Sequence, residues 1–134
     1  MRILIDTDVL LDVALNRKPY APASAEVLRW VEAGNDAAVA WHSISNCAYM
    51  LRGEGRAFLK QLLSLVEVAE VATKEARYAL DLPMSDLEDA MQVAAAQRFG
   101  AKYVVTRNLP DYKNSPVPVL SPEQFLELEF DSRR

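Results

Sequence analysis

The chain has 134 residues, 51% of them hydrophobic, which is the size and composition of one domain with one core, so we expect a single domain over residues 1–134. A net charge of −4 excludes binding of nucleic acid by overall positive charge. The single cysteine, Cys47, excludes an internal disulfide and a cysteine-based zinc site. No apolar run approaches a membrane span and no signal-peptide pattern precedes MRILID, so a cytoplasmic location is expected.

The first 51 residues predict strands and helices in alternation, from hydrophobic spacing and from the residues that begin and end helices. We expect a buried strand at 3–5, a helix at 9–17 capped by Thr7 or Asp8, a helix at 22–33, a strand at 36–43, and a helix from Ser43 or Ser45 to Leu51. Gly53 and Gly55 then interrupt the helical pattern before the apolar segment FLKQLLSLV.

The remaining residues continue the alternation. We expect an edge strand at 66–71, a helix capped by Thr73 that reaches Leu80, and a helix at 86–99 that begins with a capping box at 85–88 and ends at Gly100. Strands at 102–106 and 118–120 around a loop, a last helix capped at 121–124 and a fraying tail at 131–134 should follow. This order favours an α/β fold with a parallel sheet covered on both faces. Ligands bind such sheets beyond the carboxyl ends of the strands.

Acids and amides gather where ligands are expected. They stand after the first strand, near the start of a helix, on the capped helix and in the loop after the fourth strand: Asp6 and Asp8, Asn46, Asp86 and Asp89, and Asn108 with Asp111. Oxygen atoms are the ligands that Mg²⁺ and Mn²⁺ prefer. Without a cation, clustered buried carboxylates repel one another and their pKa values rise.

Helix capping is an alternative explanation for some of these acids. Asp8, Asp86 and Glu88 fall near predicted helix starts, where an acid stabilises the helix without any chemistry. Asp6 is different, because it ends a buried strand, where an unpaired carboxylate is costly. Asp89 lies past the cap on the helix face that it shares with Asp86, and its pattern fits a ligand and a surface acid equally.

Three segments, LIDTDVLLD, SDLEDAMQVAAA and TRNLPDY, resemble in order and spacing the PIN domain family, which includes VapC-type toxins. The resemblance implies a PIN-like three-layer α/β/α sandwich with a central parallel sheet. It also implies a Mg²⁺- or Mn²⁺-dependent ribonuclease, with Asp6 as the first family acid, Asp89 as the third, and Asn108 and Asp111 in the fourth region. Asp6, Asp89 and Asp111 would be the metal ligands, and the same three together with Asn108 would be the catalytic residues.

The chain departs from the family pattern at three places. The second family acid falls at Asn46, whose amide offers an oxygen without charge. Asp8 stands where the family often has Asn, and Asn108 where many members have Asp. These departures leave open a catalytically weak or inactive PIN-like module that binds nucleic acid or a protein partner.

Three further residues are candidates for binding substrate. Thr106 is placed to orient Asp6 or a phosphate, or it is only a hydroxyl at a strand end. Arg107 is a candidate phosphate clamp or a solvated surface arginine, and Asn46 is a candidate contact to RNA. The only histidine, His42, is interpreted as structural or as part of the rim.

The aromatic residues divide by position. Trp30, at helical spacing with apolar neighbours, predicts a core residue, whereas Trp41, Tyr49 and Tyr112 are candidates for stacking on bases.

The motif at Asp6 and Asp8 also resembles the first motif of haloacid-dehalogenase-like phosphatases, with Asp6 as nucleophile and Asp8 as general acid. The later acidic pair on a glycine turn, which that family needs, has no counterpart here. The resemblance to VapC-type toxins further implies an RNA substrate, a small antitoxin partner whose tail covers the acidic cleft, and a homodimer.

Overall fold

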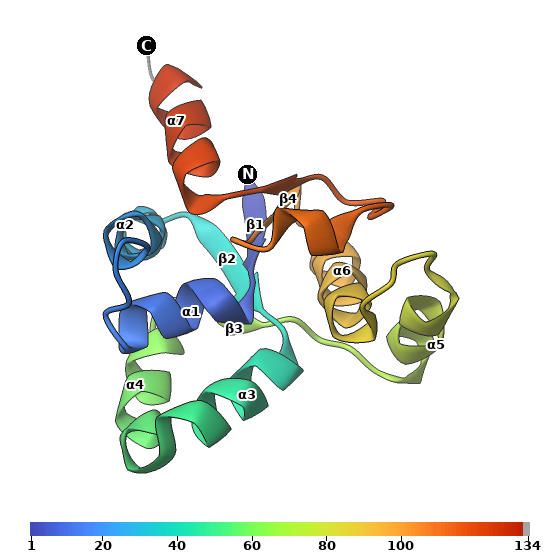
Figure 1. Ribbon diagram of the computed structural model, residues 1–134, viewed down its shortest axis with the longest axis horizontal. Coiled ribbons are helices and arrows are strands. Elements are labelled where there is room, and N and C mark those ends of the chain that lie inside the picture. The colour runs from blue at the N-terminus through green and yellow to red at the C-terminus, as the bar shows by residue number, and fades with distance from the viewer. Residues whose placement is uncertain (133–134) are drawn as a thin grey trace.

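Three consecutive side chains of the first strand, Ile3, Leu4 and Ile5, are fully buried, as expected for a strand in the middle of a parallel sheet with both faces covered. The computed structural model, which describes residues 1–132, places this strand at the centre of five parallel strands (Figure 1). In the order β3-β2-β1-β4-β5, the direction in which strands are added reverses between β1 and β4. Ligands bind such sheets at this point, beyond the carboxyl ends of the two strands.

The elements alternate as the sequence predicts. The strands are β1 Arg2–Ile5, β2 Asp36–Val39, β3 Glu67–Val68, β4 Tyr103–Val105 and β5 Val119–Leu120. The helices are α1 Thr7–Ala14, α2 Ala21–Glu32, α3 Trp41–Leu51, α4 Gly55–Leu62, α5 Thr73–Asp81, α6 Leu87–Phe99 and α7 Pro122–Ser132, with 3₁₀ turns at Arg52–Glu54 and Leu109–Tyr112.

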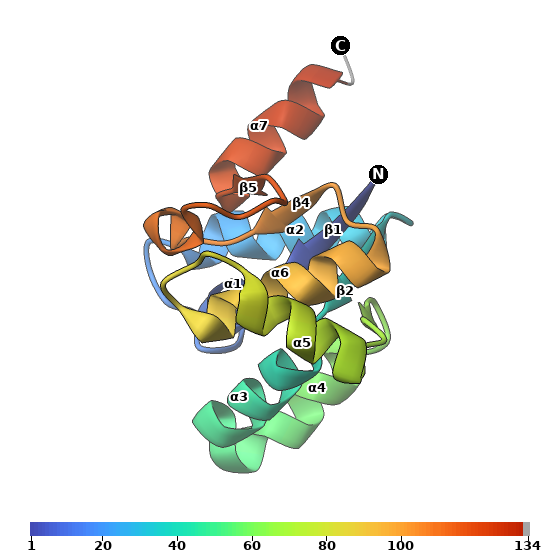
Figure 2. The same ribbon diagram turned by 90° about the vertical axis from the view of Figure 1, so that its right-hand side faces the viewer.

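Alternate side chains of the strands separate the core into two layers. Ile3 and Ile5 pack with residues of α1, α2, α3, α4 and α7 on one face of the sheet. Leu4 packs on the other face with residues of α6, which α5 covers in turn. Figure 2 shows α5 and α6 in front of the strands. The predicted three-layer α/β/α sandwich with a central parallel sheet is confirmed.

The core contains the residues expected there. Trp30 is only 6% exposed, and its ring packs edge-on against Phe125 at 4.9 Å between centroids. Cys47 is completely buried, and this burial raises the pKa of its thiol to about 11. Both residues therefore act through packing, as the sequence predicts for Trp30.

The start of the first helix differs from the prediction. Asp6, and not Thr7 or Asp8, is the N-cap of α1, and its carboxylate accepts a hydrogen bond of 2.6 Å from the Thr7 N–H. The chain turns into the helix directly after the strand, because one extended residue between them satisfies the first helical donor. The residue expected to be functional is therefore also a capping residue.

Other boundaries shift by one to four residues. The strand predicted at 36–43 ends at Val39 and α3 begins at Trp41, so His42 lies in the first turn of a helix and not at a strand end. Helix α6 is capped by Asp86, which accepts from the Asp89 N–H at 3.0 Å, instead of by a box at 85–88. Propensity places these helices correctly but does not fix their first turn.

The remaining helix ends follow the same physical rules. Helix α5 is capped by Ala72, whose N–H donates to Glu75, and not by Thr73. Helix α7 has the predicted reciprocal box, with hydrogen bonds between Ser121 and Gln124 in both directions.

Within residues 1–132, no helix has both the length and the apolar character needed to cross a bilayer. Of the tail that was predicted to fray, residues 131 and 132 belong to α7, while 133 and 134 lie outside the described residues.

Candidate metal centre

Asp6 is held at the carboxyl end of β1 by contacts from three separate segments. The Ile5–Val105 register of β1 and β4 brings Thr106 beside it, and Thr106 Oγ1 donates to Asp6 Oδ2 at 2.8 Å. The hydroxyl of Tyr112 donates to the same oxygen at 2.8 Å. Asp6 is 4% exposed, and desolvation raises the pKa of its carboxyl even though these hydrogen bonds oppose the rise. Thr106 therefore orients Asp6, as the sequence suggested.

Asp8 is the second residue of α1 and lies near the same carboxyl end of β1. Its Oδ2 accepts from the Arg107 N–H at 2.9 Å, and its Oδ1 is buried with no hydrogen-bond partner among residues 1–132. Desolvation, followed by repulsion from Asp6, raises the pKa of its carboxyl to about 6. Asp8 thus adds to the negative charge of the site and is not simply a solvated residue at a helix start.

Asp89 reaches the same place from α6. It is 4% exposed, and its pKa rises to about 8, first through desolvation and then through repulsion from Asp6, Asp86, Glu88 and Asp111. Residues 6 and 89 therefore lie together, as the metal hypothesis requires. The part of this rise that comes from repulsion is what closely spaced carboxylates produce when no cation compensates their charge.

The carboxylates form two overlapping groups that share Asp89. Ligand oxygens of Asp6, Glu88 and Asp89 lie within 4.8 Å of one another, and so do those of Asp86, Asp89 and Asp111. Three oxygen donors at this spacing fit a hard divalent cation such as Mg²⁺ or Mn²⁺. Asp111, predicted to share the cation with Asp6, belongs only to the second group.

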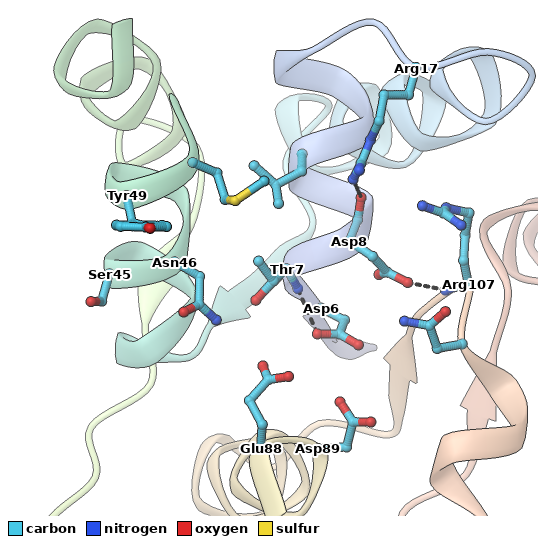
Figure 3. A pocket seen from close by; sticks show the side chains of 13 residues that line it. Asp6, Thr7, Asp8, Arg17, Ser45, Asn46, Tyr49, Glu88, Asp89 and Arg107 are labelled. Carbon is cyan, nitrogen blue, oxygen red and sulfur yellow. Dashed lines mark hydrogen bonds between the residues drawn. The ribbon is translucent and has the colours of Figure 1, made fainter. Parts of the chain in front are cut away.

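The first group opens into a cavity of about 600 Å³. Figure 3 shows Glu88 and Asp89 rising from α6 toward Asp6, with Asn46 facing them from α3. Of the other predicted site residues, Asn108 and Arg107 also line the cavity, whereas Thr106 is buried and Asp111 is not part of the lining. The structure thus brings together side chains that are up to 102 positions apart in the chain.

Arg107 makes contacts that differ from those of a solvated surface residue. Its Nε and Nη2 donate to the two oxygens of the fully buried Asp12 at 2.5 and 3.0 Å, and its guanidinium lies 3.8 Å from the centre of the Tyr20 ring. The hydrogen bonds with Asp12 raise the pKa of Arg107. This ion pair joins the loop after β4 to α1, and the role of Arg107 as a phosphate clamp stays a prediction.

The candidate stacking residues have different environments. Tyr112 is 3% exposed and donates a hydrogen bond to Asp6, so it holds this side chain in position and has no exposed ring face for a base. Desolvation, followed by the charge of Asp6, raises the pKa of its phenol. Tyr49 is 79% exposed and lines the cavity, while Trp41 is 65% exposed and lies outside it. Tyr49 alone combines exposure with closeness to the acids.

Glu88 was interpreted as a helix-start residue, and the structure shows a different role. Asp86 makes the capping contact, while the Glu88 carboxylate lines the cavity and lies 3.4 Å from Nε2 of His42. Contact with His42 lowers the pKa of Glu88. Its position directly before Asp89 was the available signal, but a capping explanation fitted the same spacing.

A buried polar network behind the site had no signal in the sequence. Ser43 Oγ accepts from Gln92 Nε2 at 2.8 Å and is 2.8 Å from Thr7 Oγ1, and all three residues are buried. They come from α3, α6 and α1, the three helices that carry Asn46, Asp89 and Asp8. The network therefore fixes the relative positions of these helices.

Comparison with known proteins agrees with this architecture. The sequence profile described as PIN domain matches residues 2–110, so the chain belongs to the PIN domain family. This match favours the family over the phosphatase alternative. A search of curated proteins gave no match.

The fold is shared with solved toxin structures. VapBC2 from Rickettsia felis, bound to a promoter DNA fragment, aligns with a TM-score of 0.72 at 17% identity, covering 90% of this chain and 98% of the other. A toxin–antitoxin complex from Klebsiella pneumoniae gives 0.64 at 23% identity, covering 90% and 97%. VapC20 from Mycobacterium tuberculosis, a toxin that cleaves the sarcin-ricin loop, gives 0.58 at 15% identity, covering 76% and 86%.

Proposed function

We propose that this protein is a Mg²⁺- or Mn²⁺-dependent ribonuclease that hydrolyses phosphodiester bonds of RNA, and that it is the toxin of a toxin–antitoxin pair. The observation that carries the proposal is the convergence of the buried Asp6 and Asp89 carboxylates at one end of the parallel sheet, beside a cavity of about 600 Å³. Membership of the PIN domain family supports it.

The residues divide the work between holding a cation and holding RNA. Asp6 and Asp89 provide the carboxylate oxygens, and Thr106 and Tyr112 fix the Asp6 side chain in one orientation. A divalent cation in this position supplies Lewis-acid chemistry, because it lowers the pKa of water and neutralises charge on the phosphate. The assignment of Asp111 as a further ligand is tested below.

The walls of the cavity provide neutral contacts for the substrate. Asn46 on α3 and Asn108 after β4 line the cavity and offer amide groups to phosphate or ribose oxygens. The Asn108 N–H donates to Thr106 Oγ1 at 3.1 Å, which connects this wall to the orientation of Asp6. The exposed ring of Tyr49 provides a surface on which a base stacks.

The test is cleavage of single-stranded RNA with Mn²⁺, compared among the wild type, Asp6→Asn, Asp89→Asn and the control Glu127→Gln. Glu127 is exposed on α7 and does not line the cavity. We expect both aspartate variants and addition of EDTA to abolish cleavage, while the control retains it and circular dichroism shows all four proteins folded. Equal residual activity in all variants would indicate a contaminating nuclease. If the wild type binds RNA without cleaving it, the result would support the inactive-module alternative, which is motivated by the neutral Asn46 at the position of the second family acid.

The partner is proposed from the structural relatives, which include toxin–antitoxin complexes. We expect a small antitoxin whose tail covers the acidic cavity and places a basic side chain among its carboxylates. The protein is also expected to form a homodimer. Co-expression with the neighbouring genes, followed by purification and light scattering, tests both. Recovery of the chain as a monomer without any co-purifying protein contradicts them.

A further inference from the structure

We propose that Glu88, and not Asp111, is the third carboxylate that holds the cation together with Asp6 and Asp89. This inference rests on the proposed function and names one residue of its site. Two overlapping groups contain Asp89, one completed by Asp6 and Glu88 and the other by Asp86 and Asp111. The two groups offer different third ligands, so the question is which one holds the ion.

The cavity lies on the side of the first group. Asp6, Glu88 and Asp89 all line it, whereas Asp86 and Asp111 do not. A cation that serves RNA cleavage has to contact both its ligands and the phosphate, and only the first group shares a space with an incoming phosphate. Figure 3 shows the Glu88 and Asp89 side chains directed from α6 toward Asp6 across this space.

The members of the second group are less suited to binding. Two of its three members, Asp86 and Asp111, are exposed, whereas Glu88 is the one exposed member of the first group, so more hydration of carboxylates has to be displaced in the second group. Oδ1 of Asp86 also accepts the capping hydrogen bond from the Asp89 N–H at 3.0 Å. Capping by itself does not distinguish the two groups, because Asp6 caps α1 in the same way; the lining of the cavity does.

The first group, in contrast, is already held in place. Asp6 is oriented by Thr106 and Tyr112, each at 2.8 Å. Glu88 Oε1 lies 3.4 Å from Nε2 of His42, which forms an ion pair with it when the imidazole is protonated. Ligands whose positions are fixed by neighbouring residues bind with less loss of side-chain freedom.

The wall of the cavity that faces the first group carries no charge at Asn46, which favours Glu88 as an additional charged ligand. Asn46, which faces the group from α3, contributes an amide oxygen and no charge. Asp8 also lines the cavity, but it is not part of the group whose oxygens lie within 4.8 Å of one another. Without Glu88, that group would compensate the two positive charges with Asp6 and Asp89 alone. A third carboxylate raises the affinity of such a site, because affinity follows the count of ligand charges.

The experiment is calorimetric titration of MnCl₂ into the folded, metal-free protein at pH 8, without RNA. The variants are Glu88→Gln, Glu88→Ala, Asp111→Asn and Asp86→Asn, and the last two keep the size of the side chain and the capping oxygen. We expect both Glu88 variants to lose roughly tenfold or more in Mn²⁺ affinity, as is typical when groups that hold a metal are removed. Asp111→Asn and Asp86→Asn should stay within about threefold of the wild type, because their charges are solvated.

Two results would overturn the inference when the wild type binds Mn²⁺. Unchanged affinity in both Glu88 variants would remove Glu88 from the ligand set, and a loss in Asp111→Asn as large as that in Glu88→Gln would restore the second group. Asp6→Asn separates this inference from the proposed function. If Asp6→Asn loses binding while Glu88→Gln retains it, only the assignment of Glu88 fails. If the wild type itself does not bind Mn²⁺, the cation-dependent function fails as well.

Discussion

Replacing Asp89 by Asn is expected to stabilise the metal-free protein at alkaline pH. The pKa of Asp89 rises from the ordinary 3.8 to about 8, mainly through desolvation and repulsion from Asp6. Because the folded-state pKa lies above the unfolded value, the native protein binds this proton more tightly than the unfolded chain. The stability associated with Asp89 is therefore fully present below about pH 4 and is lost as the pH rises through about 8.

The size of the effect follows from the difference between the pKa values of Asp89 in the unfolded and the folded protein. One pKa unit corresponds to about 1.4 kcal/mol, so the rise from 3.8 to about 8 corresponds to roughly 6 kcal/mol. Part of this energy is shared with Asp6, because either carboxyl can relieve the mutual repulsion by taking up a proton. We expect Asp89→Asn to raise the free energy of unfolding by about 2–4 kcal/mol at pH 8.5 and to have almost no effect at pH 3.5.

Urea unfolding of the metal-free wild type, Asp89→Asn and the control Glu127→Gln at several pH values between 3.5 and 8.5 measures this effect. The free energies of unfolding of the wild type and Asp89→Asn should diverge as the pH rises, while that of Glu127→Gln should follow the wild type. Adding Mn²⁺ at pH 8.5 should stabilise the wild type and leave Asp89→Asn nearly unchanged, since a ligand that binds only the native state adds to its stability. Parallel pH dependences in the wild type and Asp89→Asn would refute the reasoning.

Three other substitutions have defined outcomes. Tyr112→Phe removes the hydrogen bond to the buried Asp6 and should cost about 1–3 kcal/mol in urea unfolding at pH 8.5, with a smaller cost at pH 3.5; equal costs at both values would contradict a contact to the charged form. Arg107→Ala removes two hydrogen bonds to the buried Asp12, which keeps its ion pair with Arg17 at 3.0 Å, and should cost about 1–3 kcal/mol; no measurable cost together with weaker RNA binding would instead support the phosphate clamp. Gly100→Ala meets no neighbouring atom but forces alanine to φ +80°, so thermal melting should report a loss of about 1–2 kcal/mol, and no loss would mean that this turn readjusts.

The order of the elements followed from local patterns. The apolar run of Ile3 to Ile5, the glycine at position 100 and the box from Ser121 to Gln124 each act over a few neighbouring residues, and each appears in the structure as expected. The prediction that Asp6 ends a buried strand was equally local, because an apolar run followed by an acid marks where the strand ends. Helix starts were less well predicted, since several neighbouring residues cap equally well.

The sequence by itself determined the alternation of strands and helices and the gathering of acids at the strand ends. Only the tertiary structure decided how those acids are used. Glu88 and Asp86 both fall at the predicted start of α6, yet the packing of α6 on the sheet directs Glu88 into the cavity and leaves Asp86 at the cap. Tyr112 reaches Asp6 from 106 positions away, and no short-range pattern encodes that contact. Side-chain direction depends on how a helix packs, and packing is a property of the whole chain.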